Sequence, residues 1–238
     1  MIDKKILITG GSGLLGRELE KILPNAYYPS HSEFDIISYD KMKKYILNKK
    51  IDTILHAAAI TKLEDIRKDA TSALETNIIG TSNLVKLCME NNIRIVYVST
   101  DYVFSGEKGN YSENDELLPV NKYAWSKLGG ECAVKLYDNS LIVRTSFGPY
   151  PFPYEGAFVD QWTSRDDVRN VAKKIKQLIE SNINGIIHIG SGRKTVYEYA
   201  QTISPDKDIK KISIKDMKLV LPKDTSLNTS KYDDIFNK

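Results

Sequence analysis

The amino-acid sequence predicts an α/β fold: a doubly wound parallel sheet with helices on both faces and a small C-terminal lobe. Two observations support this. Short apolar runs suited to buried parallel strands alternate with segments of helical period along most of the 238 residues. The first apolar run leads into a glycine-rich loop and then a helix, which is how dinucleotide-binding sheets begin. With 41% hydrophobic and 27% charged residues, the chain can bury a sizeable core.

The elements follow from the residue pattern in chain order. Strands are expected at 4–9, 26–29, 52–56, 93–98, 140–144 and 186–189. Helices are expected at about 13–23, 39–49, 70–91, 121–137, 167–181 and 195–203.

Three other stretches complete the expected organisation. The polar stretch 104–119 predicts a loop over the site, and three prolines within 148–153 exclude a helix or a central strand there. The lysine-rich residues from about 205, interrupted by Pro205 and Pro222, predict a small peripheral lobe. We therefore expect a dinucleotide-binding domain over 1–147. Residues 148–238 would form a shortened substrate lobe, interleaved with the last strand and helices of that domain.

The glycine-rich loop joins the first strand to the first helix. Gly10 permits a tight turn, Gly13 lets backbone N–H groups approach a pyrophosphate at the helix N-terminus, and Gly16 lets helix and strand pack closely. A plain turn is the alternative, but it is disfavoured by the position of the loop between strand and helix. The residues that we assign here to the cofactor are Gly10, Ser12, Gly13, Leu14, Leu15 and Gly16.

Tyr123 and Lys127 lie four residues apart in the helix expected over 121–137. Residues at this spacing share one face of a helix, so both can serve one site. Free tyrosine titrates near ~10, and a nearby ammonium favours the phenolate; a lowering by about three units corresponds to roughly 4 kcal/mol. We expect Tyr123 to act as a general acid while the hydroxyl of Thr100, or of Ser99, holds a substrate carbonyl. The alternative is chance, because this spacing occurs on many amphipathic helices.

Taken together, the motifs resemble those of a known family. The glycine loop is followed by His-Ala-Ala-Ala at 56–59, Ser-Thr-Asp-Tyr-Val-Phe at 99–104, the Tyr123/Lys127 pair and Arg-Thr-Ser at 144–146. This series resembles the extended short-chain dehydrogenase/reductase superfamily and, within it, the dTDP-4-dehydrorhamnose reductase family, over roughly residues 4–147. The resemblance implies a Rossmann-like fold and an NADPH-dependent reductase of a nucleotide-linked 4-keto-6-deoxy sugar, serving polysaccharide biosynthesis. A non-catalytic NADP-binding regulatory protein and a sugar-nucleotide epimerase are the alternatives.

The end of the second strand bears on the choice of cofactor. Ser30 and His31 stand where NAD-binding folds carry an acidic residue, so the site suits the 2′-phosphate of NADP(H). Alternatively, these residues form an ordinary turn and Glu33 holds the ribose of NAD(H). The resemblance places Asp35 and Ile36 at the adenine ring. Small side chains after the third strand either let the cofactor approach the backbone or only pack tightly; they are Ala57, Ala58 and Ala59.

The resemblance also implies a substrate site, whose expected members are Thr61, Leu63, Thr100, Tyr102 and Phe147. Typical members carry Asn where this chain has His56 and Trp where it has Phe147. The segment after residue 146 is shorter than is usual in the family, so the nucleotide side of the site must be rebuilt or absent. Trp162 could rebuild it by stacking and Arg165 by pairing with a diphosphate; alternatively, Trp162 only fills space in the shortened lobe.

Composition excludes several other classes of protein. A net charge of +3 is too small to indicate nucleic-acid binding, and no run of eighteen apolar residues predicts a membrane span. The chain enters its first strand without a cleavable apolar segment, so we expect a cytoplasmic protein. Cys88 and Cys132 fall in expected helices and suggest inert thiols, neither a disulfide nor a metal site. By resemblance, a homodimer could form through the helices at 70–91 and 121–137.

Overall fold

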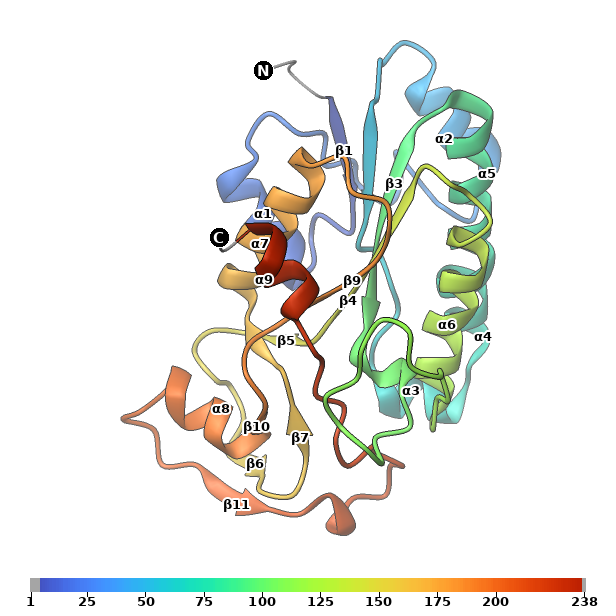
Figure 1. Cartoon of the computed structure of the whole chain (residues 1–238). Helices are drawn as coiled ribbons and strands as arrows, with labels where there is room; N and C mark the ends of the chain where they lie inside the picture. The colour runs from blue at the N-terminus through green and yellow to red at the C-terminus, as the bar shows by residue number, and fades with distance from the viewer. Residues whose placement is uncertain (1–4, 237–238) are drawn as a thin grey trace.

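The computed structural model describes residues 5–236, and its core is one parallel sheet (Figure 1). The strands are β1 (Ile6–Thr9), β2 (Thr53–His56), β3 (Arg94–Thr100), β4 (Ser140–Thr145) and β9 (Gly185–Ile189), in the order β1-β2-β3-β4-β9. All neighbouring pairs are parallel. Every residue of the first four strands is buried, because helices cover both faces of the sheet. The predicted doubly wound fold is confirmed.

Helices pack on both faces (Figure 1). One face carries α1 (Leu14–Ile22), α7 (Val168–Glu180) and α9 (Ser230–Phe236), whose apolar side chains join one core with the sheet. The other face carries α2 (Tyr39–Ile46), α5 (Thr81–Asn91) and α6 (Lys122–Val134), which share a second core. The two layers hold the carboxyl ends of β1 to β4 at one edge, where parallel sheets place their ligands.

Two sequence predictions need correction. The strand expected at 26–29 is reduced to an isolated parallel bridge between Tyr27 and Leu7, because Pro29 has no N–H with which to extend a ladder. The single helix expected at 70–91 is divided into α4 (Thr71–Ala73), the π-helix η1 (Leu74–Gly80) and α5. An apolar repeat does not reveal such a widened turn, which often occurs at functional sites. The short helix α3 (Leu63–Lys68) was not predicted, and residue 4 of the first expected strand lies outside the described residues.

The lobe is built from short elements paired in twos. β5 (Phe147–Gly148) pairs with β8 (Asp166–Asp167), β6 (Gly156–Phe158) with β11 (Lys210–Ile212), and β7 (Trp162–Thr163) with β10 (Lys194–Thr195). The helix α8 (Val196–Ile203) covers a small apolar core there. Of two 3-10 turns, η2 (Asp101–Val103) follows β3 and contacts α6, and η3 (Ile214–Asp216) follows β11.

The C-terminal residues do not all belong to a peripheral lobe. The chain returns from the lobe through a bridge between Leu227 and Tyr111, and α9 then packs on the main body. Tyr232 of α9 is 2% exposed in the core beside α7, and its hydroxyl donates to Gln177. The tyrosine and phenylalanine spacing of this last segment, at residues 232 and 236, was the available signal for a packed helix.

Candidate active site

A cavity of about 1030 Å³ lies at the carboxyl edge of the sheet, between the main body and the lobe. Most of the predicted site residues line it together: Gly10, Gly13, Leu14, Leu15, Gly16, Ala57, Ala59, Thr61, Leu63, Thr100, Tyr102, Tyr123, Lys127, Phe147 and Arg165. The other predicted residues do not line it: Ser12, Ser30, His31, Asp35, Ile36, Ala58 and Trp162. The predicted catalytic residues therefore share one space with the glycine-rich loop.

The glycine-rich loop has no room for side chains at two of its positions. Gly10 has a φ of +76°, and a Cβ there would lie 2.7 Å from the backbone nitrogen of Ala58. A Cβ on Gly16 would lie 2.4 Å from the carbonyl oxygen of Gly10. Gly13 caps α1 without a side-chain hydrogen bond, so the first N–H groups of that helix remain available for an anion.

Thr100 ends β3 in a dense network of hydroxyl groups. Its Oγ1 accepts a hydrogen bond from the backbone of Tyr102 at 3.2 Å and donates to Asp101 at 3.2 Å. Asp101 is 2% exposed and also accepts from Thr163 at 3.3 Å and Thr225 at 2.6 Å. Burial raises the pKa of Asp101, and these hydroxyl groups partly offset that effect. A carbonyl bound at Thr100 would compete with Asp101 for the single hydroxyl proton.

Lys127 is 4% exposed and lines the cavity. Its Nζ donates to the carbonyl oxygen of Val98 at 2.8 Å and lies 4.1 Å from the centre of the Tyr97 ring. Burial lowers the pKa of Lys127 to about 7, while the negative charge of Glu131 acts in the opposite direction. The ammonium group is thus poorly stabilised by the protein alone.

Tyr123 is half-buried beside Thr100 and does not have the lowered pKa that the spacing suggested. Burial raises the pKa of the Tyr123 phenol above its ordinary value, and a hydrogen bond with Thr100 lowers it by less. Asp101 adds to the rise, whereas the positive charge of Arg165 opposes it. The expected lowering by Lys127 fails because that ammonium group is directed at a backbone carbonyl, so the phenol stays protonated at neutral pH.

Two buried hydroxyl groups of the cavity wall have no hydrogen-bond partner within the described residues. They belong to Ser99 and Thr145, which are 4% and 3% exposed at the ends of β3 and β4. A buried hydroxyl without a partner costs about 1–3 kcal/mol, so such groups point to a ligand. Together with the glycine cradle and Lys127, they fit a dinucleotide whose reactive ring lies against the strand ends.

The end of the second predicted strand shows how both cofactor alternatives could arise. Glu33 accepts from the backbone of Ser30 at 2.8 Å and from its hydroxyl at 2.7 Å. The Ser30 and Ser32 hydroxyl oxygens lie 3.0 Å apart, and the ring of His31 lies 3.5 Å from Asp35. Hydroxyl groups and a carboxylate therefore meet at one exposed turn, and the preference for NADP(H) stays a prediction.

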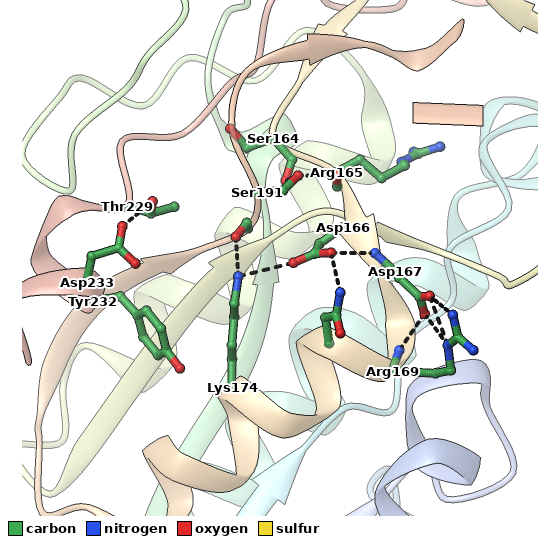
Figure 2. A network of polar contacts seen from close by, with 12 residues as sticks. Ser164, Arg165, Asp166, Asp167, Arg169, Lys174, Ser191, Thr229, Tyr232 and Asp233 are labelled. Carbon is green, nitrogen blue, oxygen red and sulfur yellow. Dashed lines mark hydrogen bonds and ion pairs between the residues drawn. The ribbon is translucent and has the colours of Figure 1, made fainter. Parts of the chain in front are cut away.

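Arg165 directly precedes β8, which leads into α7. Figure 2 shows Asp166 paired with Lys174 and Asp167 paired with Arg169, while the guanidinium of Arg165 points away from both carboxylates. Arg165 lines the cavity, and its Nε lies 3.4 Å from the hydroxyl of Ser146. Its charge therefore faces the space in which an anionic substrate would lie.

Trp162 lies elsewhere, because its ring stacks beneath the guanidinium of Arg193 at 3.8 Å. Its backbone also bonds the C-terminal segment, with its N–H donating to Lys223 at 2.7 Å. This placement favours the second interpretation of Trp162, as a side chain that packs the shortened lobe.

His56 is buried and neutral: its ring bonds the hydroxyls of Thr9 and Thr81, and burial lowers its pKa to about 3.

Sequence reasoning missed several residues of the site. Asp101, Thr145 and the apolar side chains at 217, 219 and 221 all line the cavity. A signal existed for each: Asp101 and Thr145 lie inside the motifs at 99–104 and 144–146, and four of the five residues at 217–221 are apolar. Within residues 5–236 no group of three or more potential metal ligands occurs, and both cysteines are free.

Comparison with known proteins shows the family of this chain. A family model described as the RmlD substrate binding domain matches residues 4–151. The chain belongs to this family. A dTDP-4-dehydrorhamnose reductase from Aggregatibacter actinomycetemcomitans is 36% identical over 180 residues, which cover 72% of this chain and 61% of that relative. The resemblance inferred from the motifs is confirmed.

One solved structure and one further relative are also similar to this chain. A crystal structure of dTDP-4-dehydrorhamnose reductase from Bacillus anthracis in complex with NADP has a TM-score of 0.90 and 25% identity, covering 99% of this chain and 94% of that one. The rat methionine adenosyltransferase 2 subunit beta is 26% identical, covering 85% of this chain and 72% of that relative. Among the described residues, no helix is long and apolar enough to cross a membrane.

Proposed function

We propose that this chain of the RmlD family is an NADPH-dependent reductase of the 4-keto group of a nucleotide-linked 6-deoxy sugar. The observation that carries the proposal is the meeting of Thr100, Tyr123 and Lys127 in one cavity with the glycine-rich loop. A protein that only binds a dinucleotide has no physical need for a protonated phenol beside a polar hydroxyl at the reacting position.

The reaction requires a hydride at the carbonyl carbon and a proton at its oxygen. NADPH supplies the hydride when bound. Thr100 would hold the carbonyl oxygen by its hydroxyl, and Tyr123 would donate its phenolic proton to the alkoxide that forms. The raised pKa of the phenol suits this direction, since Tyr123 carries its proton at neutral pH. The phenolate left behind would regain a proton from solvent, and Lys127, which lines the same cavity, would bind the ribose of the cofactor.

The chain's own residues also suggest how the cofactor is held. The free N–H groups at the start of α1 would bind its pyrophosphate, and Ser30 with His31 would meet the 2′-phosphate. The unpartnered hydroxyls of Ser99 and Thr145 would bond the polar part of the reactive ring. The relative crystallised with NADP supports this choice over NAD.

Arg165 is the residue best placed for the substrate's diphosphate, because its guanidinium is directed away from the neighbouring carboxylates. The keto sugar would then lie between Arg165 and Tyr123, within reach of Thr61 and Leu63. The names of the bacterial relatives suggest thymidine as the nucleoside.

The proposal is tested by following NADPH oxidation with dTDP-4-keto-6-deoxy sugars. The parent protein should oxidise NADPH in the presence of these sugars. Tyr123→Phe should lose at least about a hundredfold in kcat, as expected for loss of a general acid. Both proteins should bind NADPH with similar affinity. Tyr197→Phe, on α8 outside the cavity, serves as the matched control. Unchanged turnover in Tyr123→Phe would remove the phenol from the mechanism.

A second candidate is a non-catalytic, NADP-binding subunit. It is favoured by the relative named as a subunit of methionine adenosyltransferase, which matches a larger share of this chain than the bacterial reductase does. Tight NADPH binding without turnover of any such sugar would support it. An epimerase, a cytoplasmic location and a homodimer remain predictions from the sequence.

A further inference from the structure

Residues 213–221, called here the strap, run along the lower edge of the molecule in Figure 1, from β11 back toward the main body. Three of its apolar side chains line the cavity: Met217, Leu219 and Leu221. The residues between them, Lys218 and Val220, are exposed, and Val220 is 66% exposed. Of the three, Leu219 and Leu221 are half-buried and Met217 is 41% exposed, and together they form an apolar edge of the strap that faces the cavity.

Both ends of the strap are anchored to the residues around β7. At the first end, Asp160 accepts from the hydroxyl of Ser213 at 2.5 Å and from the backbone of Ile214 at 2.9 Å. At the other end, the buried side chain of Gln161 donates to the carbonyl of Pro222 at 3.1 Å. The position of the apolar edge is thus set by the lobe.

The end of the strap lies beside the helix that carries the phenol. Asn121, which caps α6 by accepting from Ala124 at 3.0 Å, donates through its side-chain nitrogen to the carbonyl of Val220 at 3.3 Å. Tyr123 follows in the first turn of that helix and lines the same cavity as Leu219. The strap is therefore continuous with the site, although none of its residues carries chemistry.

We infer that Met217, Leu219 and Leu221 form the surface on which the nucleobase of the substrate packs. This inference rests on the proposed function. The keto group lies at Tyr123 and the diphosphate at Arg165, so the base is the part of a nucleotide sugar left to occupy the rest of the cavity. Apolar side chains offer nothing to phosphate or sugar hydroxyls, whereas the flat faces of a base pack well against them.

The test is the affinity for dTDP, measured by calorimetry in the presence of saturating NADP. Leu219→Asn should weaken dTDP binding about tenfold, and Met217→Asn should have the same direction of effect. Val220→Asn is the matched control, because it makes the same substitution one residue away on the exposed edge. NADPH affinity and melting temperature, measured on each variant, identify any general loss of structure.

Weaker dTDP binding in the two cavity variants, with Val220→Asn and NADPH binding unchanged, would support the inference. Equal dTDP affinity in Leu219→Asn and the parent would overturn it and leave the reductase proposal standing. If the parent binds NADPH but not dTDP and reduces none of the sugars, both the inference and the proposed function are overturned. A variant that loses NADPH binding or melts early is replaced in the comparison by the other cavity variant.

Discussion

Replacing Lys127 by methionine should make the ligand-free protein more stable at low pH. The side chain is buried, and its pKa falls from an ordinary value of 10.5 to about 7 in the folded chain. Folding below pH 7 must therefore hold a charged ammonium in a site that disfavours it. At about 1.4 kcal/mol for each pH unit, the unfavourable contribution is about 5 kcal/mol below pH 7.

The sign of the pH dependence follows from proton binding. Between pH 7 and 10.5 the unfolded chain binds more protons at Lys127 than the folded chain, so the stability of the parent rises with pH across that window. Lys127→Met removes this contribution. The stability advantage of the variant should shrink by about 3 kcal/mol between about pH 6 and about pH 9. The substitution also changes packing and removes the hydrogen bond to Val98. Those effects on stability do not depend on pH, so they cancel when the two pH values are compared.

Urea unfolding followed by circular dichroism, at several pH values between these limits, measures the difference. Lys135→Met is the matched control, since Lys135 is exposed at the end of the same helix. Its stability difference from the parent should not change with pH. The reasoning is refuted if the difference between Lys127→Met and the parent is equally independent of pH.

Two further predictions concern buried polar groups. Thr145→Val should raise the stability of the free protein by about 1–3 kcal/mol, because it removes a hydroxyl that has no partner among the described residues. It should also weaken NADPH binding, measured by fluorescence. A loss of stability with unchanged NADPH binding would contradict the cofactor role of Thr145. Arg144→Met should destabilise by about 3–5 kcal/mol, because Glu131, paired with it at 2.9 Å, is left buried and charged. Adding Glu131→Leu should restore much of that loss in the same unfolding assay, and no recovery would show that the pair acts mainly through packing.

The sequence alone predicted the type of fold and the residues of the proposed catalytic centre. Apolar runs that suit burial on both faces define parallel strands, and the spacing of Gly10 and Gly16 reports a close backbone approach that any larger residue would block. Likewise, Tyr123 and Lys127 come together through helix geometry, which depends only on their separation along the chain. These features are local, so they can be predicted without knowing what packs against them.

The tertiary structure decided what each group experiences. Burial, not the nearby ammonium, sets the pKa of Tyr123, and Lys127 bonds the carbonyl of Val98 from the adjacent strand. The tertiary fold also stacked Trp162 on Arg193 and brought the strap, about ninety residues beyond Tyr123 in sequence, to the same cavity. Desolvation and long-range contacts depend on the whole packed chain, because they arise from neighbours that no local spacing identifies.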